Sequence, residues 1–118
     1  MSSTKPRVGV VGPCKSGKST LVRGLQEAGY PTHQIAQEHS FAPRMWQLID
    51  PPDVLIYLHC EYPSSVERGL DWLERDYAEQ QTRLAHARQH AAFEIATDEL
   101  PQEEVLQRVL DFLAAASA

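Results

Sequence analysis

Residues 12–20, with the sequence GPCKSGKST, carry the side chains of this chain that are best suited to chemistry. Gly12, Gly17, Lys18 and Ser19 occupy every fixed position of the pattern G-x-x-x-x-G-K-[ST]. The apolar run VGVV precedes this glycine-rich segment and a helical pattern follows it, which is the context that the motif requires. The chemistry that this arrangement predicts is the binding of a nucleotide polyphosphate.

The residue types of the glycine-rich segment fit that task for physical reasons. Backbone N–H groups converge on phosphate oxygens only where side chains are small, so we expect Gly12 and Gly17 to shape the loop. The following helix directs its N-terminal amides and its positive dipole end at the same anion. We expect Lys18 to reach the β- and γ-phosphates of ATP, and the Ser19 hydroxyl to ligate a bridging Mg²⁺. The other residues expected to line the nucleotide are Pro13, Cys14, Lys15, Ser16 and Thr20.

Alternatives remain within this segment. The whole segment has a second interpretation, a glycine-rich turn between strand and helix with a surface lysine. We expect Lys15 on the solvent side of the loop, with a contact to the γ-phosphate as the alternative, and Thr20 beside the α-phosphate. We interpret Cys14 as a small packing residue rather than a reactive thiol.

The strands and helices around this segment predict an α/β fold. Continuous apolar runs typical of buried parallel strands occupy two ranges, and two weaker runs fit an edge strand and a last strand. These four ranges are residues 7–11, 54–58, 32–36 and 92–96. Helical patterns occupy residues 17–28, 43–49, 64–90, with a break expected near 80–82, and the end of the chain from Pro101. We therefore expect a three-layer sandwich with a parallel sheet of about four strands.

Length and composition narrow the class of protein. The 118 residues fit one domain, taken here as residues 1–118. A net charge of −5 argues against nucleic acid as the main partner. The two cysteines are too few for a disulfide scaffold, the N-terminus MSSTKPR lacks the apolar stretch of a signal peptide, and no apolar run approaches the roughly 18 residues of a membrane span. We expect a cytoplasmic protein without a membrane partner.

Three stretches resemble the small P-loop kinases, the group that includes thymidylate, shikimate and adenylate kinases. They are GPCKSGKSTL, PDVLIYLHCEYPSSVERG and EIATDELPQEEVLQRVLDFL, and together they cover more than half of the chain. Only the first stretch is a specific motif, because the other two are patterns that many α/β proteins share. The resemblance implies ATP and Mg²⁺ as cofactors, phosphoryl transfer as the reaction, an aspartate that assists Mg²⁺, and arginines from a lid.

The chain departs from these kinases at the aspartate. The run LIYLHC ends without one, which leaves Glu38 and Glu61 as candidates; we prefer Glu38, and a solvated loop glutamate is its alternative interpretation. The resemblance puts the lid near Arg68, Arg75 and Arg83, where salt bridges within a helix are the alternative interpretation. Arg83 and Arg88 have a further alternative, in which they frame the adenine base.

The interval between Gly29 and Asp53 is too short for both a further strand and an acceptor-binding subdomain. Either residues 38–49 form a minimal site for an unknown small-molecule acceptor, or a protein partner completes it, and a homodimer is plausible. Three functions stay open: a small phosphotransferase, a weak NTPase or nucleotide-binding switch, and a phosphate-binding module without catalysis. We favour adenine over guanine because the N-K-x-D and T-K-x-D signatures are absent.

Overall fold

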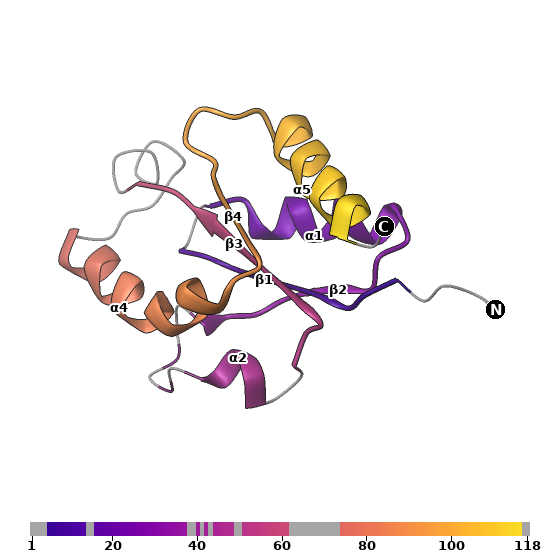
Figure 1. Cartoon of the computed structure of the whole chain (residues 1–118). Coiled ribbons are helices and arrows are strands. Elements are labelled where there is room, and N and C mark those ends of the chain that lie inside the picture. The colour runs from indigo at the N-terminus through magenta and orange to yellow at the C-terminus, as the bar shows by residue number, and fades with distance from the viewer. Residues whose placement is uncertain are drawn as a thin grey trace.

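The computed structural model describes residues 5–13, 16–37, 40, 42, 44–48, 51–61 and 74–116, with side chains in the last range described from residue 77 onward. Four strands form a single parallel sheet in the order β2-β1-β3-β4 (Figure 1). The strands are β1 (Val8–Val11), β2 (Thr32–Gln34), β3 (Val54–His59) and β4 (Phe93–Ala96). The predicted α/β class and the parallel sheet of about four strands are confirmed.

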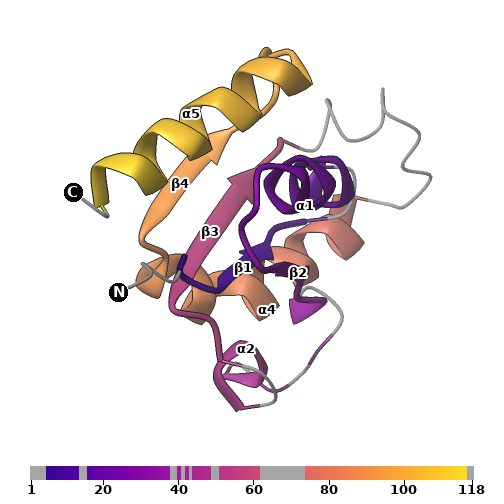
Figure 2. The same cartoon turned by 90° about the vertical axis from the view of Figure 1, so that its right-hand side faces the viewer.

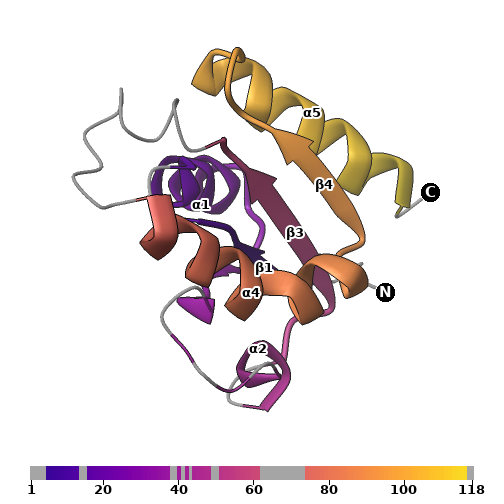
Figure 3. The same ribbon diagram turned by 90° about the vertical axis from the view of Figure 1, so that its left-hand side faces the viewer.

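Helices cover both faces of this sheet. They are α1 (Lys18–Glu27), α2 (Met45–Leu48), α4 (Glu74–His90) and α5 (Gln102–Ala116). Helices α1 and α5 lie together on one face, with α5 alongside β4 (Figure 2). Helix α4 crosses the opposite face and has α2 beside it (Figure 3). The three layers of the predicted sandwich are therefore present.

The continuous apolar strands follow from this double coverage, because a central strand with helices on both faces buries every side chain. All four residues of β1 are buried. Val8 and Val10 pack with α1 and α5, whereas Val11 packs with α2 and α4. In β3, Ile56 and Leu58 face the first pair of helices, and the two core clusters divide at the sheet. The side chains from β3 that pack on the α2 and α4 side are Leu55 and Tyr57.

Helix α4 runs through residues 80–82 without the predicted break, so that prediction was wrong. The apolar stripe does lapse there, but the buried side of the helix continues through the polar side chain of Gln80, which is only 1% exposed. Tyr77, Leu84 and Ala87 complete the same buried side. The predicted start of this helix, near residue 64, lies outside the described residues.

The turns and edges near the glycine-rich segment follow the predictions more closely. Gly29, with φ 95°, ends α1 in the left-handed conformation expected for a glycine cap. Strand β2 is an edge strand of three residues, shorter than the predicted range 32–36. The predicted helical turns at 43–49 appear as the four residues of α2.

In the described parts of the chain, we find no helix with the length and apolar character needed to cross a membrane.

Candidate functional site

The glycine-rich segment lies where the topology of the sheet favours a binding site. It joins the carboxyl end of β1 to α1, and α1 covers one face of the sheet (Figure 2). The helix that precedes β4, α4, covers the other face. The connections that leave the neighbouring strands β1 and β3 therefore run to opposite sides, and open parallel sheets bind ligands at the carboxyl ends of such strands.

The two glycines of the segment meet different structural needs. A Cβ atom on Gly12 would lie 2.3 Å from the carbonyl oxygen of Leu58, so this position leaves no space for a side chain beside β3. Gly17 has φ 99° and nothing within 4 Å of the place where its Cβ would be. Position 12 therefore requires glycine because a side chain would collide with β3. Position 17 favours glycine because its backbone is left-handed, although a side chain there would meet no neighbouring atom.

The ammonium group of Lys18 forms hydrogen bonds with the backbone of the glycine-rich segment itself. Its Nζ donates hydrogen bonds to the carbonyl oxygens of Gly12 at 2.7 Å and Pro13 at 3.0 Å. The residue is only 6% exposed, although it is the first residue of α1. Because a buried ammonium group needs hydrogen-bond acceptors, these carbonyl groups keep the charge in place beside the start of the helix.

Ser16 carries a buried hydroxyl group that has no hydrogen-bond partner among the described residues. The residue is 1% exposed. Its backbone is held on both sides, because its N–H donates to Pro13 and its carbonyl accepts from the Thr97 hydroxyl at 3.0 Å. Leaving a buried hydroxyl without a partner costs about 1–3 kcal/mol, so a hydrogen-bonding ligand at this point would be stabilised.

The first turn of α1 offers its backbone amides to the same region. Gly17 is the N-cap residue, and no side chain caps this helix end within the described structure. Two hydroxyl groups of the first turn touch other elements: Ser19 Oγ lies 2.9 Å from Gln34 Oε1, and Thr20 Oγ1 lies 3.5 Å from Gln102 Nε2. The start of α1 thus presents uncapped amides between β2 and α5.

A cavity of about 430 Å³ lies between the start of α1 and the connection from β4 to α5. Residues of the glycine-rich segment form one part of its lining, and the rest comes from α1, from the connection after β4 and from α5. The lining residues are Ser16, Gly17, Thr20, Leu21, Thr97, Leu100, Pro101, Gln102 and Val105. Three of these, Ser16, Gly17 and Thr20, were predicted to line the nucleotide, and Lys18 lies between Gly17 and Thr20 in the chain.

Sequence reasoning missed the second wall of this cavity and missed Gln34. Thr97 and Gln102 follow the last strand, and the carboxyl ends of parallel strands share one edge of the sheet, which is the signal that would have found them. Gln34 ends the short strand β2, where a polar residue beside the first strand offered a similar but weaker signal.

A second hollow of about 850 Å³ follows the outer edge of β4. Four acidic residues and one arginine contribute to its lining, namely Glu61, Glu94, Asp98, Glu99 and Arg108. Like charges repel, so this acidic lining disfavours a polyphosphate. The cavity beside the glycine-rich segment is therefore the candidate site.

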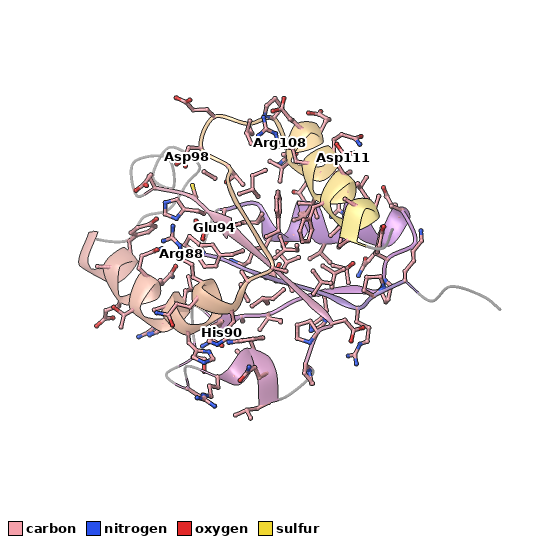
Figure 4. The ribbon with its side chains drawn as sticks, in the orientation of Figure 1. Arg88, His90, Glu94, Asp98, Arg108 and Asp111 are labelled. Atoms are coloured by element: carbon pink, nitrogen blue, oxygen red, sulfur yellow. The ribbon has the colours of Figure 1, made fainter. Side chains whose placement is uncertain are left out.

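The arginines of α4 lie on the face of the sheet opposite α1 and α5. Arg88 forms two hydrogen bonds with Glu94, at 2.9 and 2.8 Å, and Figure 4 shows this pair between α4 and β4. The hydrogen bond to Arg88 lowers the pKa of Glu94, and the same bond raises the pKa of Arg88. The structure therefore does not bring Arg88 to the cavity to frame a base. Arg83 forms the i, i+4 ion pair with Glu79 that the sequence suggested, at 3.6 Å.

Several predicted site residues lie outside the described structure. These are Cys14, Lys15, Glu38 and Arg68, together with the side chain of Arg75. Glu61, the other candidate for assisting Mg²⁺, is described: its carboxylate lies 2.8 Å from His59 Nε2, and its N–H donates to Asp98. Glu61 is thus tied to the ends of β3 and β4.

Trp46 is packed in the core between α2 and α4 and is 8% exposed, so it is not available to stack on a bound base. Within the described ranges, no three His, Cys, Asp or Glu side chains gather as metal ligands.

A scan of the sequence against protein-family models and a search of curated proteins both gave no match.

Proposed function

We propose that this chain binds ATP with Mg²⁺ and transfers its terminal phosphoryl group, as a small phosphotransferase of the P-loop kinase type. One observation carries the proposal. Ser16, with a buried hydroxyl that lacks a partner in the described structure, and Gly17, with its open left-handed backbone, line one cavity, and the buried Lys18 follows them directly in the chain. A bound polyphosphate would accept hydrogen bonds from the Ser16 hydroxyl and from the amides of the first turn of α1, and would offer Lys18 a charged acceptor.

The phosphate end of the site fits a change of partners by Lys18. In this structure the partners of the ammonium group include two neutral carbonyl oxygens, those of Gly12 and Pro13. Hydrogen bonds between an ammonium group and a phosphate oxygen are charge-assisted and roughly twice as strong as neutral ones. A phosphate placed over Gly17 and the amides of the first turn would therefore compete well for the Lys18 side chain.

The remainder of the cavity fits a nucleoside. Its volume of about 430 Å³ falls within the range of small-molecule sites, about 300–1,000 Å³. Leu100, Pro101 and Val105 supply apolar surface for a planar base, and the amide of Gln102 supplies donors and acceptors at the rim. Adenine is proposed over guanine because the sequence lacks the guanine-reading signatures.

The predicted cofactor Mg²⁺ fits the start of α1, where Ser19 offers a hydroxyl oxygen and lies in the chain between Gly17 and Thr20, which line the cavity. Ser19 would hold the ion, which would supply electrostatic stabilisation of the negative charge on the phosphates. We retain Glu38 as the residue that would orient the nucleophile, and Arg75 or Arg83 as the residues that would stabilise the transferred phosphoryl group.

The acceptor separates this function from its alternatives, a weak NTPase or nucleotide-binding switch and a phosphate-binding module. The protein would be incubated with Mg·ATP, alone and with pooled nucleosides and small metabolites, and ADP release would be measured. A phosphotransferase releases ADP mainly when the acceptor is present. Slow release regardless of the pool would instead identify an NTPase, and no release with retained ATP binding would identify a binding module. A Lys18→Ala variant serves as the control for contaminating activity.

A further inference from the structure

The hydroxyl group of Ser19 and the side-chain amide of Gln34 connect α1 to the end of β2. Ser19 Oγ lies 2.9 Å from Gln34 Oε1. An amide oxygen only accepts hydrogen bonds, so the hydroxyl is the donor and its single hydrogen points at Gln34. The two lone pairs of the hydroxyl oxygen are then directed away from β2.

A hydroxyl group that ligates a metal through a lone pair keeps its hydrogen, and that hydrogen needs an acceptor. Side chains behind a ligand often provide such an acceptor, and they orient the ligand and tune its affinity for the metal. We propose that Gln34 is the positioning residue for Mg²⁺ in this chain, holding the Ser19 hydroxyl with its lone pairs toward the ion. This inference rests on the proposed function, since it concerns the metal of the same site.

The register of the sheet explains why Gln34 reaches Ser19. Strand β2 pairs in parallel with β1 and puts Gln34 opposite Val10, two residues before Gly12. The carboxyl ends of both strands therefore lie at the same edge, beside the first turn of α1. Gln34 and Ser19 are both exposed, so a hydrated ion can reach the hydroxyl oxygen.

Gln34 also differs from the acidic candidates that the sequence suggested. Glu61 is engaged with His59 and Asp98 at the ends of β3 and β4, whereas Gln34 directly contacts the predicted metal ligand. Its amide accepts the hydrogen bond without adding negative charge. A carboxylate at the same position would accept the same hydrogen and also attract the divalent cation.

Two variants test this role through the Mg²⁺ dependence of ATP binding, measured by titration calorimetry in EDTA and over a series of MgCl₂ concentrations. Gln34→Met removes the acceptor and should raise the Mg²⁺ concentration that gives half of the gain in ATP affinity by about tenfold. Gln34→Glu keeps an acceptor, adds a charge and should lower that concentration. In EDTA, Gln34→Met should bind ATP as the wild type does. Gln107→Met, on the exposed side of α5, is the matched control and should follow the wild type throughout.

Other results would overturn the inference. A Gln34→Met protein that follows the wild-type Mg²⁺ curve would show that the amide does not position the ligand. Equal weakening of ATP binding in EDTA and in Mg²⁺ would show that Gln34 acts on the nucleotide or the fold instead. Absence of ATP binding by the wild type under every condition would overturn the proposed function, and this inference with it. Unfolding temperatures without nucleotide should agree between wild type and Gln34→Met, because the side chain is exposed.

Discussion

The Thr97 hydroxyl donates a hydrogen bond to the main-chain carbonyl of Ser16, with 3.0 Å between the two oxygen atoms, across 81 positions of sequence. Thr97 is 3% exposed, and its backbone N–H donates to the carbonyl of His59. This contact joins the end of β4 to the glycine-rich segment. These two parts of the chain form the two walls of the candidate site. This buried hydroxyl group therefore helps to set the spacing of those walls, together with the contact between Thr20 and Gln102.

Replacing Thr97 with valine keeps the shape of the side chain but removes this donor. We expect the unfolding free energy to fall by about 1–3 kcal/mol, because the buried carbonyl of Ser16 loses a partner, and ATP affinity to fall with it. Urea unfolding measures the first effect. Thr82→Val is the matched control, since the Thr82 hydroxyl is exposed and bonds only within α4 in the described structure, to Ala78. Equal losses for the two variants would contradict a special role for Thr97.

The two glycines should respond differently to alanine. Gly17→Ala should cost about 1–2 kcal/mol, because a Cβ there is strained by the left-handed backbone but meets no neighbouring atom. Gly12→Ala should cost more, because the new Cβ would lie 2.3 Å from the carbonyl oxygen of Leu58 and the backbone must move. Chemical unfolding of both variants compares these costs. A larger loss for Gly17→Ala would show that the contact between the segment and β3 is loose.

The contact between α2 and α4 should make stability depend on pH. Trp46 Nε1 donates to His86 Nδ1 at 3.1 Å, which requires a neutral ring, and His90 stacks on His86 with ring centroids 4.3 Å apart. Figure 4 shows His90 at the end of α4, next to α2. Burial lowers the pKa of His86 below its usual 6.5, and the nearby charges of His90 and Arg44 lower it further.

A histidine whose pKa is lowered by folding binds protons more readily in the unfolded chain. Stability should therefore fall as the pH drops below the unfolded pKa of about 6.5 toward the lowered folded pKa. His33, whose pKa is lowered by burial and by Arg7, acts in the same direction. Urea unfolding at a series of pH values should give a smaller slope for His86→Gln than for the wild type. Identical slopes would assign the whole effect to other groups.

Among the polar residues that pack near α2, we expect substitution of Gln37 to lower the free energy of unfolding most. Its side chain is fully buried and bonds to the carbonyls of Ala42 and Arg83 and to the N–H of Trp46. Gln37→Met keeps the volume but leaves these groups unsatisfied, so we expect a loss of about 3 kcal/mol in urea unfolding. Gln107→Met, at an exposed position, should change stability by less than about 0.5 kcal/mol. A loss as small as that for Gln37→Met would contradict the role of these bonds.

Local patterns in the sequence were enough to predict the parallel sheet and the position of the glycine-rich segment between the first strand and the first helix. The unbroken apolar runs of β1 and β3 and the left-handed glycine after α1 depend on residues close in sequence. The second wall of the cavity was not predictable in this way, since Thr97 and Gln102 reach the segment only through the order of the strands. The pairing of Arg88 with Glu94 joins two different elements, so helical spacing gave no sign of it. The break predicted near residues 80–82 failed for a different reason. Gln80 is polar, yet it continues the buried face of α4.

The central claim is that the glycine-rich segment binds the polyphosphate of ATP through Lys18. Titration calorimetry with Mg·ATP tests it directly, on the wild type and on Lys18→Ala, with circular dichroism to verify that both are folded. Lys5→Ala is the matched control, because Lys5 Nζ also bonds to a main-chain carbonyl, that of Ala28 beyond the far end of α1. We predict that the wild type and Lys5→Ala bind Mg·ATP, and that Lys18→Ala binds it about 30-fold more weakly or not at all. Unchanged affinity in a folded Lys18→Ala protein would contradict the account.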